Sequence, residues 1–409
     1  MEFPELKKCR NMVFSCNRES YCRDMVRIDG TWLICPVREH TGGFDAYTAK
    51  GRNAIARALL KGQIDIDDGL IDIVYTCALC GNCVEHCEMY TPEAMARWSK
   101  LPLFAPLKIT YEDHIVKTPE VTKALRADIF NAGYKVPEGI ARVGESIERC
   151  GNIFNVSSSD MYNWKPKSLP EKAKLVYFPG CLAGYSFPEI GQSTVKILKS
   201  AGEEFTMFDH CCGNPLFITG QLKLARDVVE RDVMKLEDVG AEKIVTTCAG
   251  CYRCISKEWP KIIGRDLDFE VASAAQLIQD YLKEGRIGPL SLEHEITVTY
   301  HDPCELGRHS SVYEEPRSII KSIKGVKMVE MGRNMQSAWC CGGGGGLKIC
   351  KPDLATEIAR ERVQEAEETG ASAIVSACPS CKLNIQDAIG VTSSPLKMID
   401  LVELIADAL

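Results

Sequence analysis

Residues 340–342 read Cys340-Cys341-Gly342, and the same three residues stand earlier in the chain as Cys211-Cys212-Gly213. In each copy a single cysteine in or after a proline-containing turn comes before this motif, and a C-x-x-C pair comes after it. The single cysteines are Cys181 and Cys304, and the pairs are Cys248 with Cys251 and Cys378 with Cys381. Corresponding residues lie 123 to 130 positions apart, so three separate motifs recur at nearly one offset. We interpret this recurrence as an internal duplication.

Short apolar runs precede the cysteines of both copies, and helical runs lie between them. The expected strands are Lys174–Phe178, Lys243–Thr247, Ile296–Tyr300 and Ala373–Ser376. The expected helices are Leu222–Val239 and Leu354–Thr369, the second of which stops at Gly370. Strands that alternate with helices predict an α/β fold with parallel pairing. This fold would bring the cysteines together at the carboxyl ends of the strands.

The first hundred residues carry eight further cysteines, with short helices expected at Arg52–Lys61 and Asp68–Val74. In the run Cys77-x-x-Cys80-x-x-Cys83-x-x-x-Cys87, three closely spaced thiols suit one cubane 4Fe-4S cluster, and the fourth is typical of a ligand to a second cluster. The partner set is Cys9, Cys16, Cys22 and Cys35, the last of which is followed by Pro36. Crossed ligation predicts one cluster on Cys35, Cys77, Cys80 and Cys83, and another on Cys9, Cys16, Cys22 and Cys87. Zinc, or no metal at all, is the alternative for the irregular partner set.

The adjacent cysteines of the duplicated motif favour a cluster of several irons, because neighbouring thiolates reach different irons more readily than they share one ion. The glycines beside them, Gly213 and Gly342–Gly346, allow backbone N–H groups to approach sulfur closely. Structural zinc is the alternative here as well. Three cysteines lie outside every motif, namely Cys150, Cys254 and Cys350. Apolar packing is the default for such thiols, and Cys254 is also a candidate alternative ligand.

Composition narrows the class of protein. The chain has 409 residues, 49 Lys+Arg against 56 Asp+Glu, a formal net charge of -7, and 21 cysteines. The acidic balance disfavours nucleic acid as a partner, and no apolar run is long enough for a membrane helix. The first residues contain no secretory signal. These features predict a cytoplasmic chain in which clustered cysteines bind metal rather than form disulfides, and any membrane association would be made through a partner subunit.

The motifs resemble those of a known family. A cysteine-rich CCG motif that occurs twice behind a two-cluster ferredoxin segment is similar to the D subunit of heterodisulfide reductase, and the resemblance covers nearly the whole chain. It implies two ferredoxin cubane clusters and two non-cubane 4Fe-4S clusters. The non-cubane clusters would be held by Cys181, Cys211, Cys212, Cys248 and Cys251 in one copy and by Cys304, Cys340, Cys341, Cys378 and Cys381 in the other. The expected division is a helical ferredoxin-like domain over 1–110, a connecting segment over 111–172, and α/β CCG domains over 173–290 and 291–409.

The resemblance also implies a function. The chain would be an oxygen-sensitive oxidoreductase that reduces a mixed disulfide like that of coenzyme M and coenzyme B at the two non-cubane clusters. Electrons would enter through the cubane clusters from a separate flavoprotein, ferredoxin or membrane cytochrome b. The alternative is an electron-transfer subunit that links a flavin dehydrogenase of the lactate, glycolate or glycerol-3-phosphate type to quinone or cytochrome.

Several other side chains flank the motifs. His210 and His301 are candidate proton donors to the substrate, or simply hydrogen-bond donors to cluster sulfur. Cations that could meet an anionic thiol, or could be ordinary surface charges, are Arg253, Arg308, Lys348 and Lys382.

Overall fold

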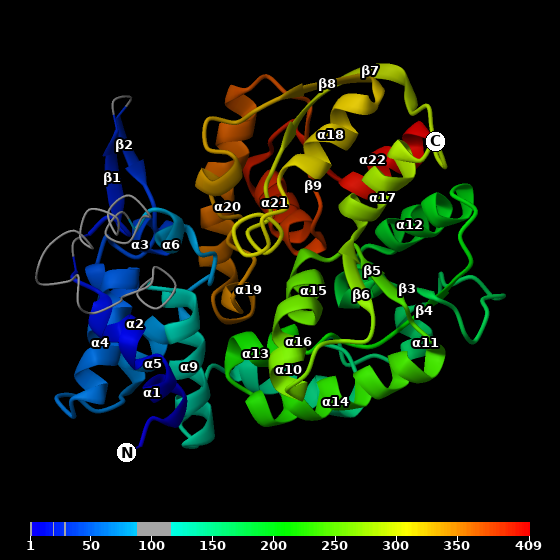
Figure 1. Cartoon of the computed structure of the whole chain (residues 1–409). Helices are drawn as coiled ribbons and strands as arrows, with labels where there is room; N and C mark the ends of the chain where they lie inside the picture. The colour runs from blue at the N-terminus through cyan, green and yellow to red at the C-terminus, as the bar shows by residue number, and fades with distance from the viewer. Residues whose placement is uncertain (1, 19, 28–29, 88–115) are drawn as a thin grey trace, which may run out of the picture.

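The computed structural model describes residues 2–18, 20–27, 30–87 and 116–409, and the expected domain boundary at residue 110 lies outside them. A helical amino-terminal part lies beside two α/β repeats, which run from green to red in Figure 1. No described helix has the length and apolar character that crossing a membrane requires.

Short helices around cysteine loops form the amino-terminal part. They are α1 (Pro4–Lys8), α2 (Arg10–Ser15), α3 (Pro36–Glu39), α4 (Ala49–Leu60), α5 (Asp68–Tyr75) and α6 (Asn82–Glu85), with a hairpin of β1 (Asp24–Arg27) and β2 (Gly30–Leu33). α4 begins where the Thr48 side chain accepts a hydrogen bond from the Gly51 N–H, and α5 begins where Asp67 accepts one from Leu70. The helices expected at Arg52–Lys61 and Asp68–Val74 are therefore confirmed as α4 and α5.

Much of the stretch expected to connect the domains is helical. It contains α9 (Thr118–Asn131), α10 (Glu138–Cys150) and the single turn α11 (Ser158–Met161). Val121 and Leu125 of α9 join the core that α4 and α5 form in the amino-terminal part. Val143 and Ile147 of α10 instead pack into the core of the first repeat. The stretch therefore ties the two parts together through its buried faces.

The first repeat is a four-stranded parallel sheet in the order β4-β3-β5-β6. Its strands are β3 (Leu175–Phe178), β4 (Phe205–Met207), β5 (Lys243–Thr246) and β6 (Glu270–Ser273). Its helices are α12 (Pro188–Ser200), α13 (Asn214–Thr219), α14 (Leu222–Val239), α15 (Ala249–Arg253), α16 (Trp259–Ile263) and α17 (Ala274–Lys283), with π-helical turns at Leu182–Ser186 and Cys254–Glu258.

The second repeat is a parallel sheet in the order β10-β9-β7-β8. Its strands are β7 (Ser291–Tyr300), β8 (Lys324–Val329), β9 (Ala373–Ser376) and β10 (Lys397–Asp400). Its helices are α18 (Glu314–Ser322), α19 (Leu347–Cys350), α20 (Pro352–Glu368), α21 (Pro379–Thr392) and α22 (Leu401–Ala408). When strands are matched by their order along the chain, the two sheets have the same topology, so the duplication and the α/β fold class are confirmed.

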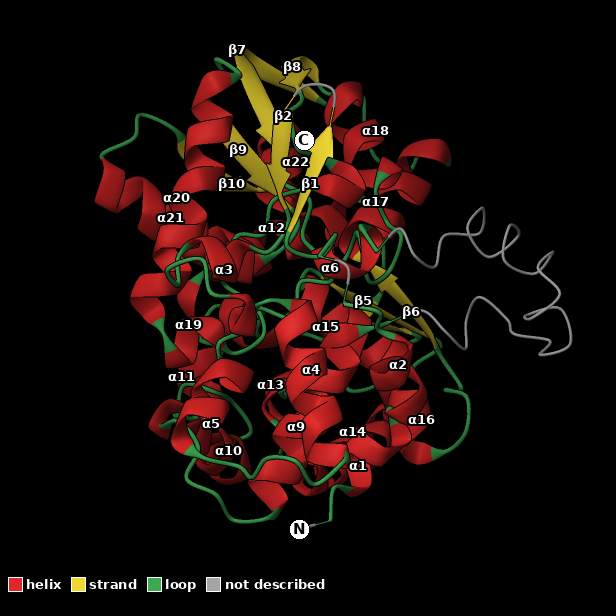
Figure 2. Cartoon of the chain, turned by 90° about the vertical axis from the view of Figure 1, so that its left-hand side faces the viewer, coloured by secondary structure: helices red, strands yellow, loops and turns green. Residues whose placement is uncertain are grey.

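The two repeats share one hydrophobic core. Tyr177 and Val245 of the first sheet belong to the same buried group as Val298 and Val375 of the second. Figure 2 shows the two sheets as separate layers, with β7 to β10 above β5 and β6. A continuous core fixes the position of one repeat against the other, and with it the position of their cysteines.

Candidate metal centre

The cysteines of both repeats lie at the carboxyl ends of their parallel strands. Cys181 follows β3, Cys211 follows β4 and Cys248 follows β5. In the second repeat Cys304 follows β7 and Cys378 follows β9. Loops at this edge of a parallel sheet are where α/β folds place their sites, so each sheet presents its five motif cysteines together.

In the second repeat the five sulfurs form one connected group, made by Cys304, Cys340, Cys341, Cys378 and Cys381. The Sγ atoms of Cys341 and Cys381 are 3.3 Å apart. The N–H of Gly342 donates to the Cys340 sulfur at 3.3 Å, and the N–H of Gly343 donates to the Cys341 sulfur at 3.4 Å. The backbone thus already directs hydrogen-bond donors at the sulfurs, as it does around metal clusters.

The first repeat has the same arrangement, with hydrogen bonds that join Cys181, Cys211, Cys212, Cys251 and Cys248 in that order. The N–H of Cys251 donates to the Cys248 sulfur at 3.4 Å. Gly180, at a φ of 75°, forms the turn before Cys181, and a Cβ atom there would lie 2.9 Å from the Cys251 sulfur. Only glycine allows the chain to pass so close to the sulfur group.

The buried sulfurs cannot all carry a negative charge without cations among them. Hydrogen bonds from Cys251 and Cys378 lower the pKa of Cys248 to about 5, whereas the hydrogen bond to Cys248 helps to raise the pKa of Cys378 to about 12. One thiol therefore ionises only because its neighbour keeps a proton. Metal ions replace such protons, because thiolates are their ligands. The donor set of both repeats fits iron–sulfur clusters.

The amino-terminal cysteines fall into two groups. Cys35, Cys77, Cys80 and Cys83 act on one another electrostatically, and burial raises the pKa of Cys35 to about 12. Cys22 is influenced by Cys16 and Cys87. Cys22 also acts on Cys83, so the two groups are neighbours, and the crossed ligand sets stay a prediction. The thiol of Cys9 is influenced instead by Glu120, Lys123, Glu5 and Asp128, around the end of α9.

Two sulfur contacts join these sites into one series. Cys80 of the amino-terminal part is hydrogen-bonded to Cys340 of the second repeat, and Cys248 of the first repeat is hydrogen-bonded to Cys378 of the second. The glycine run lies against the amino-terminal loop, because a Cβ atom on Gly345 would lie 2.5 Å from the carbonyl oxygen of Cys77. The sulfurs of the second repeat thus contact those of the amino-terminal part on one side and those of the first repeat on the other.

A buried arginine that sequence reasoning missed holds this junction. Arg126 of α9 is fully buried and donates hydrogen bonds to backbone carbonyls of three parts of the chain. The acceptors are Val74, Tyr75 and Cys77 in the amino-terminal part, Ile218 in the first repeat and Gly345 in the second. Its pKa is lowered by burial. No motif surrounds Arg126 in the sequence, so only the tertiary structure reveals its role.

The two candidate histidines lie in different surroundings. His301 is buried, and one of its ring nitrogens lies within 4.8 Å of the sulfurs of Cys341 and Cys381. His210 is partly exposed, and its Nδ1 lies 2.9 Å from Asp232 Oδ1. The structure thus places His301 at the second sulfur group and turns His210 toward a carboxylate.

The candidate cations are mostly engaged in ion pairs. Lys382 pairs with Glu189 of α12 and Glu403 of α22 at 3.1 and 2.7 Å, so it joins the repeats to each other. Lys348 pairs with Asp387 at 2.7 Å. Neither lysine is therefore available to an anionic substrate in this arrangement.

The two candidate arginines line a pocket where the amino-terminal part meets both repeats. Arg253 pairs with Glu120, Glu258 and Glu305. Arg308 donates to the carbonyl of Cys80 at 2.7 Å and to that of Ala338 at 2.7 Å. Arg308 thus helps to hold the Cys80 loop against the second repeat.

Each of the three unassigned cysteines has a local partner. The thiol of Cys254 donates to the carbonyl of Cys212 at 3.2 Å, and Asn384, at the corresponding position of the second repeat, donates to the carbonyl of Cys341. Cys254 therefore occupies a structural position that an amide fills in the other copy. Cys150 donates to Asn155 at 3.4 Å, and Cys350 packs at the edge of the amino-terminal core.

One cavity lies beside the loop that carries Cys181. It has a volume of about 710 Å³ and lies between α10, the turn after Cys181, α19 and α21. Its apolar wall includes Phe154, Leu182, Ile349 and Leu383. Leu182 directly follows Cys181, and Leu383 follows Cys381 by two residues. The backbone of Ile153, which also lines the cavity, is hydrogen-bonded to the Cys181 sulfur.

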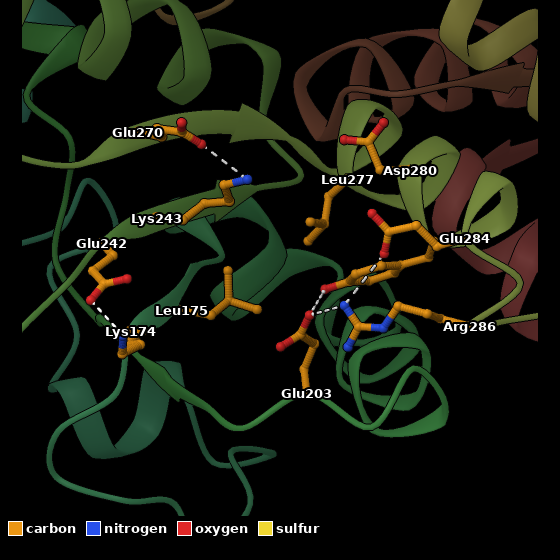
Figure 3. Close-up of a pocket in the computed structure, with 11 residues that line it drawn as sticks. Lys174, Leu175, Glu203, Glu242, Lys243, Glu270, Leu277, Asp280, Glu284 and Arg286 are labelled. Carbon is orange, nitrogen blue, oxygen red and sulfur yellow. Dashed lines mark hydrogen bonds and ion pairs between the residues drawn. The ribbon is translucent and has the colours of Figure 1, made fainter.

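A second cavity, of about 450 Å³, lies at the opposite edge of the first sheet, where β3, β5 and β6 begin (Figure 3). Its charged side chains pair with one another. Lys174 meets Glu242 at 2.8 Å, and Lys243 meets Glu270 at 3.0 Å. Because the cysteines lie at the other ends of these strands, this cavity is separate from the metal centre.

Comparison with known proteins agrees with this architecture. Residues 12–90 match the 4Fe-4S dicluster domain, and residues 175–256 and 298–386 match the cysteine-rich domain CCG. The chain is 32% identical to the D subunit of dihydromethanophenazine:CoB--CoM heterodisulfide reductase from Methanosarcina barkeri, over 81% of this chain and 93% of that protein. It is 33% identical to the corresponding protein of Methanosarcina acetivorans, over 82% and 93%.

A further relative is the B subunit of fumarate reductase (CoM/CoB) from Methanothermobacter marburgensis, which is 30% identical over 82% of this chain and 62% of that protein. The cofactors of the chain are therefore two cubane 4Fe-4S clusters in the amino-terminal part and non-cubane 4Fe-4S clusters in the cysteine-rich repeats. With its dicluster segment, its two cysteine-rich repeats and this similarity over nearly the full length of the Methanosarcina proteins, the chain is an iron–sulfur oxidoreductase that belongs to the family of heterodisulfide reductase D subunits.

Proposed function

We propose that the chain is the catalytic subunit of a reductase that cleaves a mixed disulfide, of the type that joins coenzyme M to coenzyme B. The observation that carries this proposal is the contact between Cys248 and Cys378, which brings two complete five-cysteine sets face to face. A disulfide presents two sulfurs, and its cleavage into two thiols consumes two electrons and two protons. When bound, the clusters supply those electrons one at a time.

The sulfur groups support one proposed set of ligands for each cluster. Cys181, Cys211, Cys212, Cys248 and Cys251 would hold one non-cubane cluster, and Cys304, Cys340, Cys341, Cys378 and Cys381 would hold the other. The cubane clusters would be held by Cys35, Cys77, Cys80 and Cys83, and by Cys9, Cys16, Cys22 and Cys87. The domains would span 1–110, 111–172, 173–290 and 291–409, and α9 would fold with the first of them because its apolar face completes that core.

The substrate would enter through the cavity beside α10. Phe154, Leu182 and Leu383 offer an apolar wall near the Cys181 loop, which suits an organic thiol with an aliphatic arm. His210, paired with Asp232 and partly open to solvent, is suited to carry protons toward the first repeat. The electron donor would be a separate flavoprotein, ferredoxin or membrane cytochrome b, and the chain would act in the cytoplasm.

The test is to add the mixed disulfide to the anaerobically reduced holoprotein and to count the thiols released. We expect two thiols for each disulfide consumed, and we expect their release to stop in Cys378→Ala but to continue in the control Cys254→Ala. If a chain with its full iron content released no thiol, it would instead be an electron-transfer subunit that links a flavin dehydrogenase to quinone or cytochrome. Zinc in place of iron would exclude both functions.

A further inference from the structure

The two repeats differ at one buried position next to their sulfur groups. Three residues before the single cysteine, the second repeat has His301 where the first has Phe178. Both side chains are buried, with exposed fractions of 1% and 0%. The backbone is equivalent, because each residue stands where a central strand, β7 or β3, ends. The copies therefore offer a polar N–H donor at one site and a hydrocarbon at the other.

The tautomer of His301 is fixed by a buried arginine. The Nε–H of Arg362, on α20, donates to His301 Nδ1 at 3.1 Å. Arg362 is itself held by Glu365 at 2.6 Å and by the carbonyl of Arg333 at 2.8 Å. A guanidinium can only donate, so Nδ1 must accept, and the ring proton lies on Nε2.

The protonated nitrogen faces sulfur. In the described part of the chain, His301 Nε2 is buried and has no hydrogen-bond partner. The sulfurs of Cys341 and Cys381 lie beside the ring, since the two sulfurs and a ring nitrogen of His301 are all within 4.8 Å of one another. The Cys341 sulfur is close enough to His301 for the histidine to influence its ionisation. A buried N–H without another acceptor is therefore directed at one of the proposed cluster ligands.

At the helix position that corresponds to Arg362, the first repeat has a negatively charged residue. α14 and α20 start 130 residues apart, and the residue of α14 that corresponds to Arg362 is Asp232. Asp232 is fully buried and faces Nδ1 of His210 at 2.9 Å. The ring of His210 is thus turned to a carboxylate. At the position of His301, Phe178 stacks on Phe208, with ring centroids 5.7 Å apart.

We propose that His301, oriented by Arg362, donates its Nε2–H to the Cys341 sulfur and thereby sets the reduction potential of the second-repeat cluster above that of the first. This inference rests on the proposed ligand sets. A hydrogen bond to a ligating sulfur stabilises the more negative, reduced form of a cluster and so raises its potential. The second repeat also contacts Cys80 of the amino-terminal part. The cluster with the higher reduction potential is therefore the first of the two to receive electrons from the amino-terminal clusters. Arg362 is a positioning residue for this bond.

The test is an anaerobic redox titration of the holoprotein followed by electron paramagnetic resonance. His301→Phe places the first-repeat residue in the second repeat and removes the donor. We expect the second-repeat midpoint to fall by about 59 mV, which corresponds to a tenfold change in the reduced fraction for a one-electron couple. His301→Gln keeps an N–H donor and should retain most of the wild-type potential. Arg362→Met frees the ring and should lower the potential in the same direction as His301→Phe.

His210→Phe is the matched control, because it removes the histidine of the other repeat and should leave the second-repeat midpoint unchanged. Unaltered midpoints in His301→Phe, with the full iron content present, would overturn the inference while leaving the proposed function intact. Equal losses of potential in His301→Phe and His301→Gln would overturn it as well. Loss of the second-repeat iron in His301→Gln would make His301 a ligand rather than a hydrogen-bond donor. Thiol release is measured separately, so a failure of the proposed function would be recognised independently.

Discussion

The guanidinium of Arg126 donates a hydrogen bond of 2.7 Å to the backbone carbonyl of Gly345, although the two residues are 219 positions apart in the chain. The same side chain holds the carbonyl of Cys77 at 3.0 Å and that of Ile218 at 2.6 Å. One buried cation thus joins the amino-terminal cysteine loop to both repeats. The carbonyls that it binds are buried with it, so their satisfaction depends on this one residue.

Arg126→Met should therefore destabilise the whole chain. The substitution keeps apolar volume but leaves several buried carbonyls without a donor, and each costs about 1–3 kcal/mol. We expect a loss of at least about 3 kcal/mol, seen as a clear fall in the melting temperature of the holoprotein. Arg142→Met is the control, since Arg142 makes an exposed ion pair with Glu138 and its removal should change stability by less than about 1 kcal/mol. Similar melting temperatures for the two variants would contradict the role of Arg126.

Gly345→Ala should separate a steric clash from backbone strain. Gly345 has a φ of 62°, and a Cβ atom there would meet the backbone of Cys77 and Ala78. Gly370 has a φ of 71° but no atom within 4 Å of its ideal Cβ position. Gly370→Ala should therefore cost only the backbone strain of about 1 kcal/mol. We expect Gly345→Ala to lower the melting temperature further than Gly370→Ala, and equal effects would show that the glycine run does not need its close approach to the cysteine loop.

Cys211→Ala tests the proposed ligands of the first repeat. Cys211 is hydrogen-bonded to both Cys181 and Cys212, so its loss should remove the iron of one cluster and spare the amino-terminal clusters. Iron analysis and electron paramagnetic resonance of the anaerobic protein provide the measurement. Cys254→Ala is the matched control. The Cys254 thiol donates a hydrogen bond to the carbonyl of Cys212, so we expect the Cys254→Ala variant to keep the full iron content. An iron content that falls equally in both variants would remove the distinction between ligand and structural cysteine.

Glu258 should stabilise the fold at neutral pH. Burial opposes its ionisation, but Lys123, Arg253 and Lys261 outweigh that effect and lower its pKa to about 2, from an ordinary value of 4.5. Because the folded pKa lies below the unfolded one, the stabilisation is fully present above about pH 4.5 and is lost as the pH falls toward about 2. Its size is on the order of 3 kcal/mol.

Glu258→Gln should therefore lower the melting temperature at pH 7, and the difference from the wild type should shrink below pH 4.5. Glu357→Gln, which alters an exposed pair with Arg360, should have almost no effect at either pH. A Glu258→Gln variant as stable as the wild type at pH 7 would show that the ion pairs only balance the cost of burial.

The sequence predicted those parts of the fold in which a local pattern decides the outcome. The central strands β3, β5 and β9 are short runs of apolar residues, and α14 was predicted with its observed ends from the helical spacing of its apolar residues. Six other strands of the described chain were missed, namely the hairpin of β1 and β2 and the strands β4, β6, β8 and β10. Lys324–Val329 carries two lysines on a sheet edge, and Lys397–Asp400 combines an exposed lysine with a buried aspartate, so neither has the composition of a buried strand.

Local sequence patterns likewise predicted one part of the candidate site and not the other. Cysteine spacing identified the sulfur groups, because ligands to one cluster must recur at short intervals along the chain. Arg126 and Arg362 could not be found by spacing, since their partners lie 49 to 219 and 29 to 61 positions away outside their own helices. Their importance follows from burial against partners that are distant in the sequence, and that burial depends on the tertiary structure.

The contact between Cys248 and Cys378 joins a residue to its own counterpart in the other copy. In an assembly of two identical subunits, such a self-pairing occurs only on a twofold axis, at an isologous interface. The chain therefore has the architecture of a homodimer whose subunits have been fused end to end. Because the two halves are covalently linked, each half is present at a high effective concentration near the other, which favours their association. Fusion also frees each half to change without imposing the same change on its partner, so that Asp232 and Arg362 can carry opposite charges at one ancestral position.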